Sequence, residues 1–104
     1  MSAKGATKED ELMLVYKAAY RWESGVCLGE VLDFPGTVSF GHTLEEARKS
    51  LAGALEDMAE TNLIQGEALP IPDPTKTDTQ SEIEEPIYVV IHAGHQVSIQ
   101  VATK

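Results

Sequence analysis

The chain has 104 residues, with 8 Lys or Arg against 17 Asp or Glu, which gives a formal net charge of −9 at pH 7. This length has room for one small domain, and the acidity argues against direct binding of nucleic acid, which depends on clustered cations. No apolar run approaches the roughly 20 residues of a membrane span, and no apolar leader opens the chain. Cys27 is the single cysteine, so an internal disulfide is excluded and a reducing, cytoplasmic location is expected.

The N-terminal part divides into a polar segment and an alternating one. Residues 1–11 are polar and of mixed charge, and we expect them to be disordered. Apolar residues then recur with a period of two, which predicts a strand over 12–22 with one buried face. The buried parity carries the aromatic residues Tyr16, Tyr20 and Trp22. Because Lys17 and Arg21 fall on the other parity, we interpret these aromatics as core or subunit-interface packing rather than as an RNA-stacking surface.

Two further strands are predicted, each joined by a tight turn. A hairpin turn at 23–25 leads into a strand over 26–32, in which Gly29 indicates a bulge or a close backbone approach. A Pro-Gly turn at 33–36 leads into a short strand over 37–40. Three strands joined in this way predict an antiparallel meander.

The strongest helix signal begins at Thr43. Thr43 and Glu46 form a capping box, in which Glu46 is expected to reach back to the main-chain amide of Thr43. Gly66 fits the position just after a helix end, so we predict a helix over about 43–65. Its apolar residues recur at steps of three and four: Leu44, Ala47, Leu51, Leu55 and Met58.

Residues 66–86 differ in composition from the rest of the chain. Their prolines exclude a helix, and acidic residues outnumber the single cation, Lys76. We predict an extended acidic linker that is ordered only where it lies against another surface. Six carboxylates are candidates for binding a cationic partner protein: Glu67, Asp73, Asp78, Glu82, Glu84 and Glu85. The open alternative is a solvated spacer.

The C-terminal part is strongly β-prone. We predict strands over 87–93 and 96–102, joined by Gly94 and His95 in a type II′ turn. This register pairs Tyr88 with Val101, Val90 with Ile99, and His92 with Val97. Such apolar strands favour a homo-oligomer, most simply a dimer closed by edge pairing or strand exchange.

The order of elements, β-β-β-α-β(β), predicts an α+β domain over 12–104, with the helix on one face of a mixed sheet. The connection through the helix permits a parallel crossover to the last strands, which should be right-handed.

Three motifs follow one another at fixed spacings: D-F-P-G at 33–36, G-H-T-L-E-E-A at 41–47, and G-E-A-L-P-I-P at 66–72. In this order they resemble the HicB-like antitoxin family, and the resemblance covers about residues 12–74. It implies a partial RNase H-like fold and a partner, a small basic HicA-type toxin that cleaves mRNA. The motif residues that we expect to be structural are Asp33, Pro35, Gly36, Gly41, Thr43, Glu46, Gly66, Pro70 and Pro72.

The sequence departs from the family pattern at three places. His42 stands where the family usually has an acid, and Thr37 stands where a cysteine is common. Many members also carry a C-terminal DNA-binding domain, whereas here a β segment follows the core. We therefore expect no direct contact with an operator.

Catalysis by an RNase H-like nuclease would need clustered carboxylates around metal ions. The acids borne by the predicted strands are Glu30 and Asp33, and Asp33 is better explained as a turn residue. His92 and His95 lack a third metal ligand. We expect no catalytic residue, no cofactor and no metal.

Two functions remain open at this point. The first is an antitoxin that neutralises a HicA-type toxin by occlusion, without catalysis. The second is an orphan interaction module of the same fold, which works as a homo-oligomer without a toxin.

Overall fold

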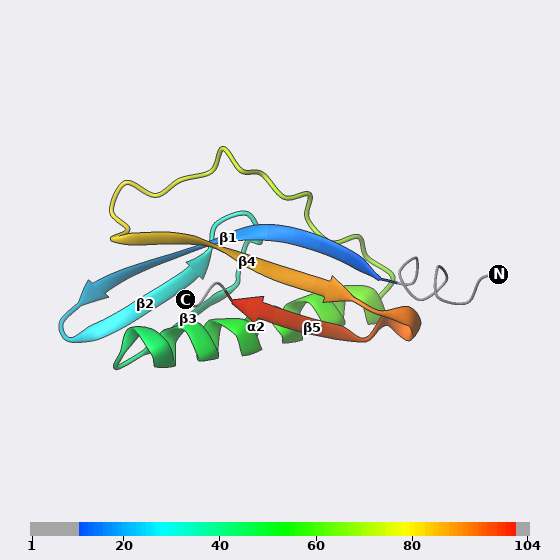
Figure 1. The fold of residues 1–104 in the computed structure, drawn as a ribbon, viewed down its shortest axis with the longest axis horizontal. Helices are drawn as coiled ribbons and strands as arrows, with labels where there is room; N and C mark the ends of the chain where they lie inside the picture. Colours follow the sequence, from blue (N-terminus) through cyan, green and yellow to red (C-terminus); the bar gives the residue numbers. More distant parts are fainter. Residues whose placement is uncertain (1–10, 102–104) are drawn as a thin grey trace.

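The computed structural model describes residues 11–101 of the chain. Two predictions therefore concern residues outside this range. They are the disorder of the N-terminal segment, of which the structure describes Glu11 alone, and the end of the last strand at residue 102. The elements are β1 (Leu12–Glu23), β2 (Val26–Val31), β3 (Val38–Gly41), α2 (Leu44–Ile64), β4 (Ile83–Ile91), the short 3₁₀ turn η1 (Ala93–His95) and β5 (Val97–Val101). The strands form one sheet in the order β3-β2-β1-β4-β5 (Figure 1). The predicted α+β fold is confirmed.

The prediction of a mixed sheet is wrong, because every pair of neighbouring strands is antiparallel. The reason lies in residues 66–82, which we call the strap. After α2 has run along the sheet, the strap returns to the end at which α2 began (Figure 1). This additional reversal makes β4 antiparallel to β1 and removes the parallel crossover.

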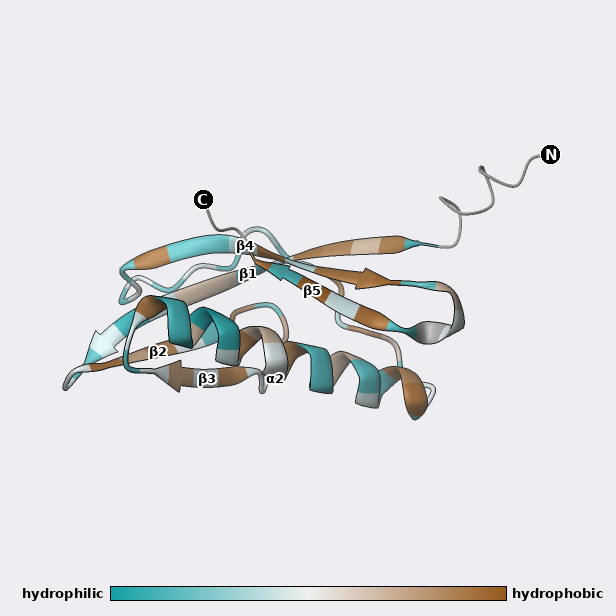
Figure 2. Ribbon diagram, turned by 60° about the horizontal axis from the view of Figure 1, so that its bottom comes forward, coloured by the Kyte–Doolittle hydropathy of each residue, from teal (hydrophilic) through white to brown (hydrophobic). Residues whose placement is uncertain are grey.

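Helix α2 covers one face of the sheet. It contacts β2, β3 and β5, so that the curved sheet wraps around it (Figure 2). The helix contributes the buried residues Ala47, Leu51, Leu55 and Ala59. Opposite them, Tyr16 and Tyr20 lie in the core as predicted, whereas Trp22, beside the turn after β1, stays 42% exposed.

The start of α2 is capped slightly differently from the prediction. The Thr43 hydroxyl accepts a hydrogen bond from the Glu46 amide at 3.0 Å, as the capping box requires. The Glu46 carboxylate, however, accepts from the amide of His42 at 2.9 Å and not from that of Thr43. The chain bends tightly here, because a Cβ at Gly41 would lie 2.5 Å from the Ala47 nitrogen. Only glycine allows the end of β3 to approach the helix so closely.

Two other glycines were singled out by the sequence. Gly66 follows the helix end with φ +75°, the left-handed conformation expected just after a helix. Gly29 pairs regularly with Tyr20 and forms no bulge. A Cβ at Gly29 would lie 3.0 Å from the Tyr20 ring, so it is a side chain, and not another stretch of backbone, that packs closely against this glycine.

Strand β4 begins at Ile83 and includes Pro86, so the linker ends four residues before its predicted end. Pro86 pairs with Lys17. The Lys17 amide donates to Asp33 and its carbonyl accepts from the Leu32 amide, so both main-chain groups point away from β4. Pro86 thus occupies a non-hydrogen-bonded pair, in which its missing N–H costs the ladder nothing.

The register of the C-terminal hairpin differs from the prediction by one residue. The turn has three residues rather than two, with Gly94 at φ +80° and the His92 amide donating to the Gln96 carbonyl at 2.7 Å. A one-residue shift exchanges the two faces of a strand. The observed pairs that share the helix face are Ile87 with Val101, Val89 with Ile99, and Ile91 with Val97.

Candidate functional site

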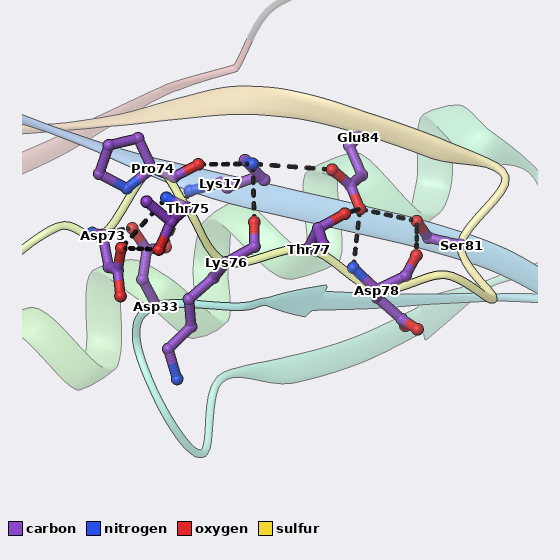
Figure 3. A network of polar contacts seen from close by, with 10 residues as sticks. All are labelled: Lys17, Asp33, Asp73, Pro74, Thr75, Lys76, Thr77, Asp78, Ser81 and Glu84. Carbon is purple, nitrogen blue, oxygen red and sulfur yellow. Dashed lines mark hydrogen bonds and ion pairs between the residues drawn. The ribbon is translucent and has the colours of Figure 1, made fainter.

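The strap lies on the face of the sheet opposite α2 (Figure 1). Lys17 of β1 holds it there. The Lys17 ammonium donates to the main-chain carbonyls of Pro74 at 3.0 Å and Lys76 at 2.7 Å. It also lies 3.7 Å from the Glu84 carboxylate (Figure 3). Because Lys17 alternates with the core residues of β1, its side chain necessarily points to this second face.

Asp33 joins the strap to the sheet. Its carboxylate is buried and accepts one hydrogen bond from the Lys17 amide and one from the Asp73 amide, both at 2.9 Å. The sequence assigns Asp33 only to a turn. Its partners lie 16 and 40 positions away, so no local pattern reveals the second role.

Tyr16 makes a further attachment, at the beginning of the strap. Its hydroxyl donates to the Pro70 carbonyl at 2.7 Å, and its ring meets that of Phe34 edge-on with centroids 5.3 Å apart. Burial, assisted by the negative charge of Asp33, raises the pKa of Tyr16 to about 12. The hydroxyl therefore stays protonated and continues to donate at neutral pH.

These contacts explain part of the motif pattern. The turn that supplies Asp33 and Phe34 meets the segment that supplies Pro70 at one end of the strap. Within the same motifs, Pro35 is exposed in the turn and Pro72 is half-buried in the strap.

Three of the six predicted partner-binding carboxylates accept hydrogen bonds from the strap itself, and Figure 3 draws those of Glu84 and Asp73. Glu84 accepts from the Thr77 hydroxyl, the Asp78 amide and the Ser81 hydroxyl at 2.8, 2.9 and 3.1 Å. Asp73 accepts from the amide and hydroxyl of Thr75 at 3.1 and 2.6 Å. These bonds favour the charged form and lower the pKa of both carboxyls.

Asp78 is the third, since it accepts from the Gln80 amide at 3.0 Å. Its other oxygen lies 3.9 Å from the Arg21 guanidinium.

The remaining three predicted carboxylates lie in different surroundings. Glu85 points to the helix face and forms a two-bond pair with Arg48 at 2.8 and 2.9 Å, with 12% of its side chain exposed. Glu82 is exposed at the end of the strap and accepts from the Trp22 amide at 3.3 Å. Glu67 is exposed at the beginning of the strap. Five of the six thus lie on the strap or beside it, and Glu85 lies apart from them.

The other candidate groups are placed as follows. Cys27 is buried, which raises the pKa of its thiol. His92 contacts the Ser98 hydroxyl at 2.9 Å and Glu11 at 3.3 Å, and His42 is exposed. Within residues 11–101, no three His, Cys, Asp or Glu side chains gather as they would around a metal ion. No helix in this part of the chain is long and apolar enough to cross a membrane.

Comparison with known proteins identifies the family of the chain. A family model described as UPF0150-like matches residues 15–70, more than half of the 104 residues. The matched stretch contains Tyr16, Asp33, Phe34 and Pro70, the residues that attach the strap at its beginning. No curated protein and no solved structure matches the chain.

Proposed function

The chain belongs to the UPF0150-like family, and from this premise we propose that it is a HicB-like antitoxin. It binds a small basic HicA-type toxin in the cytoplasm and blocks the toxin by occlusion, without chemistry of its own. The three motifs and their resemblance to HicB-like proteins support this proposal.

The observation that carries the proposal is the ordered acidic strap. Lys17, Asp33 and Tyr16 hold it against the sheet before any partner arrives. A segment that is already ordered loses little conformational entropy when it binds. Carboxylates in such a segment attract a cationic surface and occupy the place where RNA phosphates would otherwise lie.

Binding of the purified chain to a basic toxin encoded beside it tests the proposal. Calorimetry gives the affinity, and cleavage of an RNA substrate reports inhibition of the toxin. The informative variant is the double substitution Glu67→Gln and Glu82→Gln, because both side chains are exposed and neither closes a turn of the strap. We expect it to weaken binding by about tenfold at low salt, and by less at high salt.

A matched control removes two charges elsewhere. Glu56→Gln combined with Asp57→Asn changes α2, away from the strap, and should leave the affinity within about twofold of the original. Equal losses in the two double variants would assign the effect to net charge alone. A toxin that cleaves RNA at the same rate with and without the chain would refute the proposal.

The second candidate, an orphan module that associates with itself, is favoured by one observation. Val38 and Phe40 on the edge strand β3 are 61% and 62% exposed. Purification from the native host separates the two candidates. A basic protein of about 60–90 residues should accompany an antitoxin, whereas an orphan module should bring only its own copies.

A further inference from the structure

The outer edge of β3 is open for pairing. β3 is the last strand of the sheet, and its pairs with β2 alternate between hydrogen-bonded and non-hydrogen-bonded. The Val31 amide donates to the Thr37 carbonyl, which fixes the phase of this alternation. The main-chain N–H and C=O groups of Val38 and Phe40 therefore point away from β2, toward the open edge.

A groove lies beside this edge, on the face opposite α2. It encloses about 390 Å³, and Leu28, Val38 and Phe40 supply its apolar wall. Asp78 and Ser81 of the strap form the opposite side. The strap thus serves as one wall of a hollow whose other wall is the edge strand β3.

The other edge strand, β5, differs in what it exposes. Its apolar residues Val97 and Ile99 are buried or half-buried on the helix side. The hollow between β5 and α2 is lined by the cations Arg48 and Lys49. Edge strands are usually protected by charges, prolines or coverage. In β3, with the sequence V-S-F-G, the side chains provide none of these.

Charge around the groove selects the kind of partner. Glu30 on β2 and Glu82 on the strap are exposed, and Asp78 lines the groove. The cation of this region, Arg21, lies 3.2 Å from Glu23 and 3.9 Å from Asp78. The acids outnumber the cation, so a second copy of this chain would bring the same negative rim against itself. A cationic segment meets complementary charge.

We propose that the β3 edge binds an extended cationic segment of a partner protein as a sixth strand. Main-chain hydrogen bonds to Val38 and Phe40 hold the segment, an apolar side chain enters the groove, and its cations face Glu30 and the strap. The inference rests on the proposed function in one respect, namely that the partner carrying the segment is the basic toxin.

The first experiment uses the full chain and three synthetic nine-residue peptides. In the first peptide, lysine alternates with valine and phenylalanine; the second has proline at its centre; the third has glutamate in place of lysine. We expect calorimetric binding of the first peptide and at least about tenfold weaker binding of the other two. Hydrogen exchange at the Val38 and Phe40 amides should slow with the first peptide only.

A pair of variants controls for folding and for general charge effects. Phe40→Lys places a cation on the edge, whereas Ile71→Lys makes the same kind of change at a strap residue that is 88% exposed. Phe40→Lys should weaken binding of the first peptide by about tenfold or more, and Ile71→Lys by less than about twofold. Equal effects of the two variants, or equal binding of the proline peptide, would overturn the inference. So would self-association of the chain that Phe40→Lys abolishes, because the edge would then belong to a second copy.

The same variants, tested with the toxin, separate this inference from the proposed function. A toxin that binds the original chain and Phe40→Lys equally refutes the β3 site and leaves the antitoxin proposal intact. A toxin that fails to bind a chain whose β3 edge still binds the peptide refutes the antitoxin proposal and supports the edge site.

Discussion

Helix α2 and the strap cover opposite faces of one sheet, and different forces hold them. The helix is held by apolar area, since Leu51 and Leu55 are fully buried against the strands. The strap is held by individual polar groups, chiefly Lys17 and Asp33. The helix should therefore respond to changes of volume, whereas the strap should respond to single charges and to pH. Four experiments test this difference, beginning with the largest expected effect.

Removal of a buried side chain from the face of α2 that packs on the sheet should lower the free energy of unfolding the most. Leu51→Ala removes a fully buried side chain and leaves a cavity, so the free energy of unfolding should fall by about 2–5 kcal/mol. Urea denaturation measures this change. Ile64→Ala, at the 85% exposed end of the same helix, should change it by less than about 0.5 kcal/mol.

Asp33→Asn should release the strap while α2 stays in place. The side-chain amide that this substitution introduces would place its own N–H donor against one of two main-chain N–H donors, that of Lys17 or that of Asp73. The lost hydrogen bond should lower the free energy of unfolding by about 1–3 kcal/mol. Trypsin should then cut faster after Lys76, the only Lys or Arg in the strap. Asp57→Asn on α2 is the matched control. Unchanged cleavage after Lys76 in Asp33→Asn would mean that Asp33 does not hold the strap.

Tyr16→Phe tests the attachment at Pro70 with a smaller change. Loss of this hydrogen bond should lower the free energy of unfolding by about 0.5–1.5 kcal/mol at neutral pH. Because the pKa of Tyr16 is raised to about 12 in the folded state, its contribution is complete below the ordinary value of 10.0. That contribution disappears as the pH rises toward 12. The stabilities of the original chain and Tyr16→Phe should therefore converge in alkaline denaturation.

Acid should loosen the strap before it disturbs the helix. The pKa values of Asp73 and Glu84 are lowered from 3.8 and 4.5, so their contribution is present above these values and disappears as the pH falls through the folded-state values. The protection factors of strap amides against hydrogen exchange, such as those of Thr75 and Asp78, should fall on acidification while those of α2 amides are unchanged. The double variant Asp73→Asn with Glu84→Gln should lose this pH dependence. Simultaneous loss of protection in the strap and in α2 would contradict the expectation that the two respond separately to acid.

Sequence alone predicts the elements that depend on local patterns. Alternation over β1, the cap at Thr43 and the glycine after α2 each involve neighbouring residues, and the structure confirms them. The first four residues of β4 were not predicted, because Pro86 argues against a strand in the sequence. A strand accepts this proline only because the main-chain groups of Lys17, its partner in β1, point away from it. The predicted register of the C-terminal hairpin was wrong because the turn has one more residue than expected, which exchanges the two faces of the strand.

The candidate site was predictable only in part. Composition identified the acidic segment, but not which side of the sheet it covers. Asp33 and Lys17 hold the strap through partners distant in the chain, so their roles become visible only once the strands are placed. Glu85 shows the converse case: it belongs to the acidic segment by sequence and to the helix face by its pairing with Arg48.

The pairing of β4 with the central strand β1 has a kinetic consequence. The meander β1–β2–β3 and the hairpin β4–β5 each consist of strands adjacent in the sequence. The two units join only where β1 pairs with β4, between residues more than sixty positions apart. Closing so large a loop costs chain entropy before the pairing contributes any stability. We expect the N-terminal meander to form first, with the edge of β1 that pairs with β4 still exposed. Docking of the C-terminal hairpin onto this edge should then limit the folding rate.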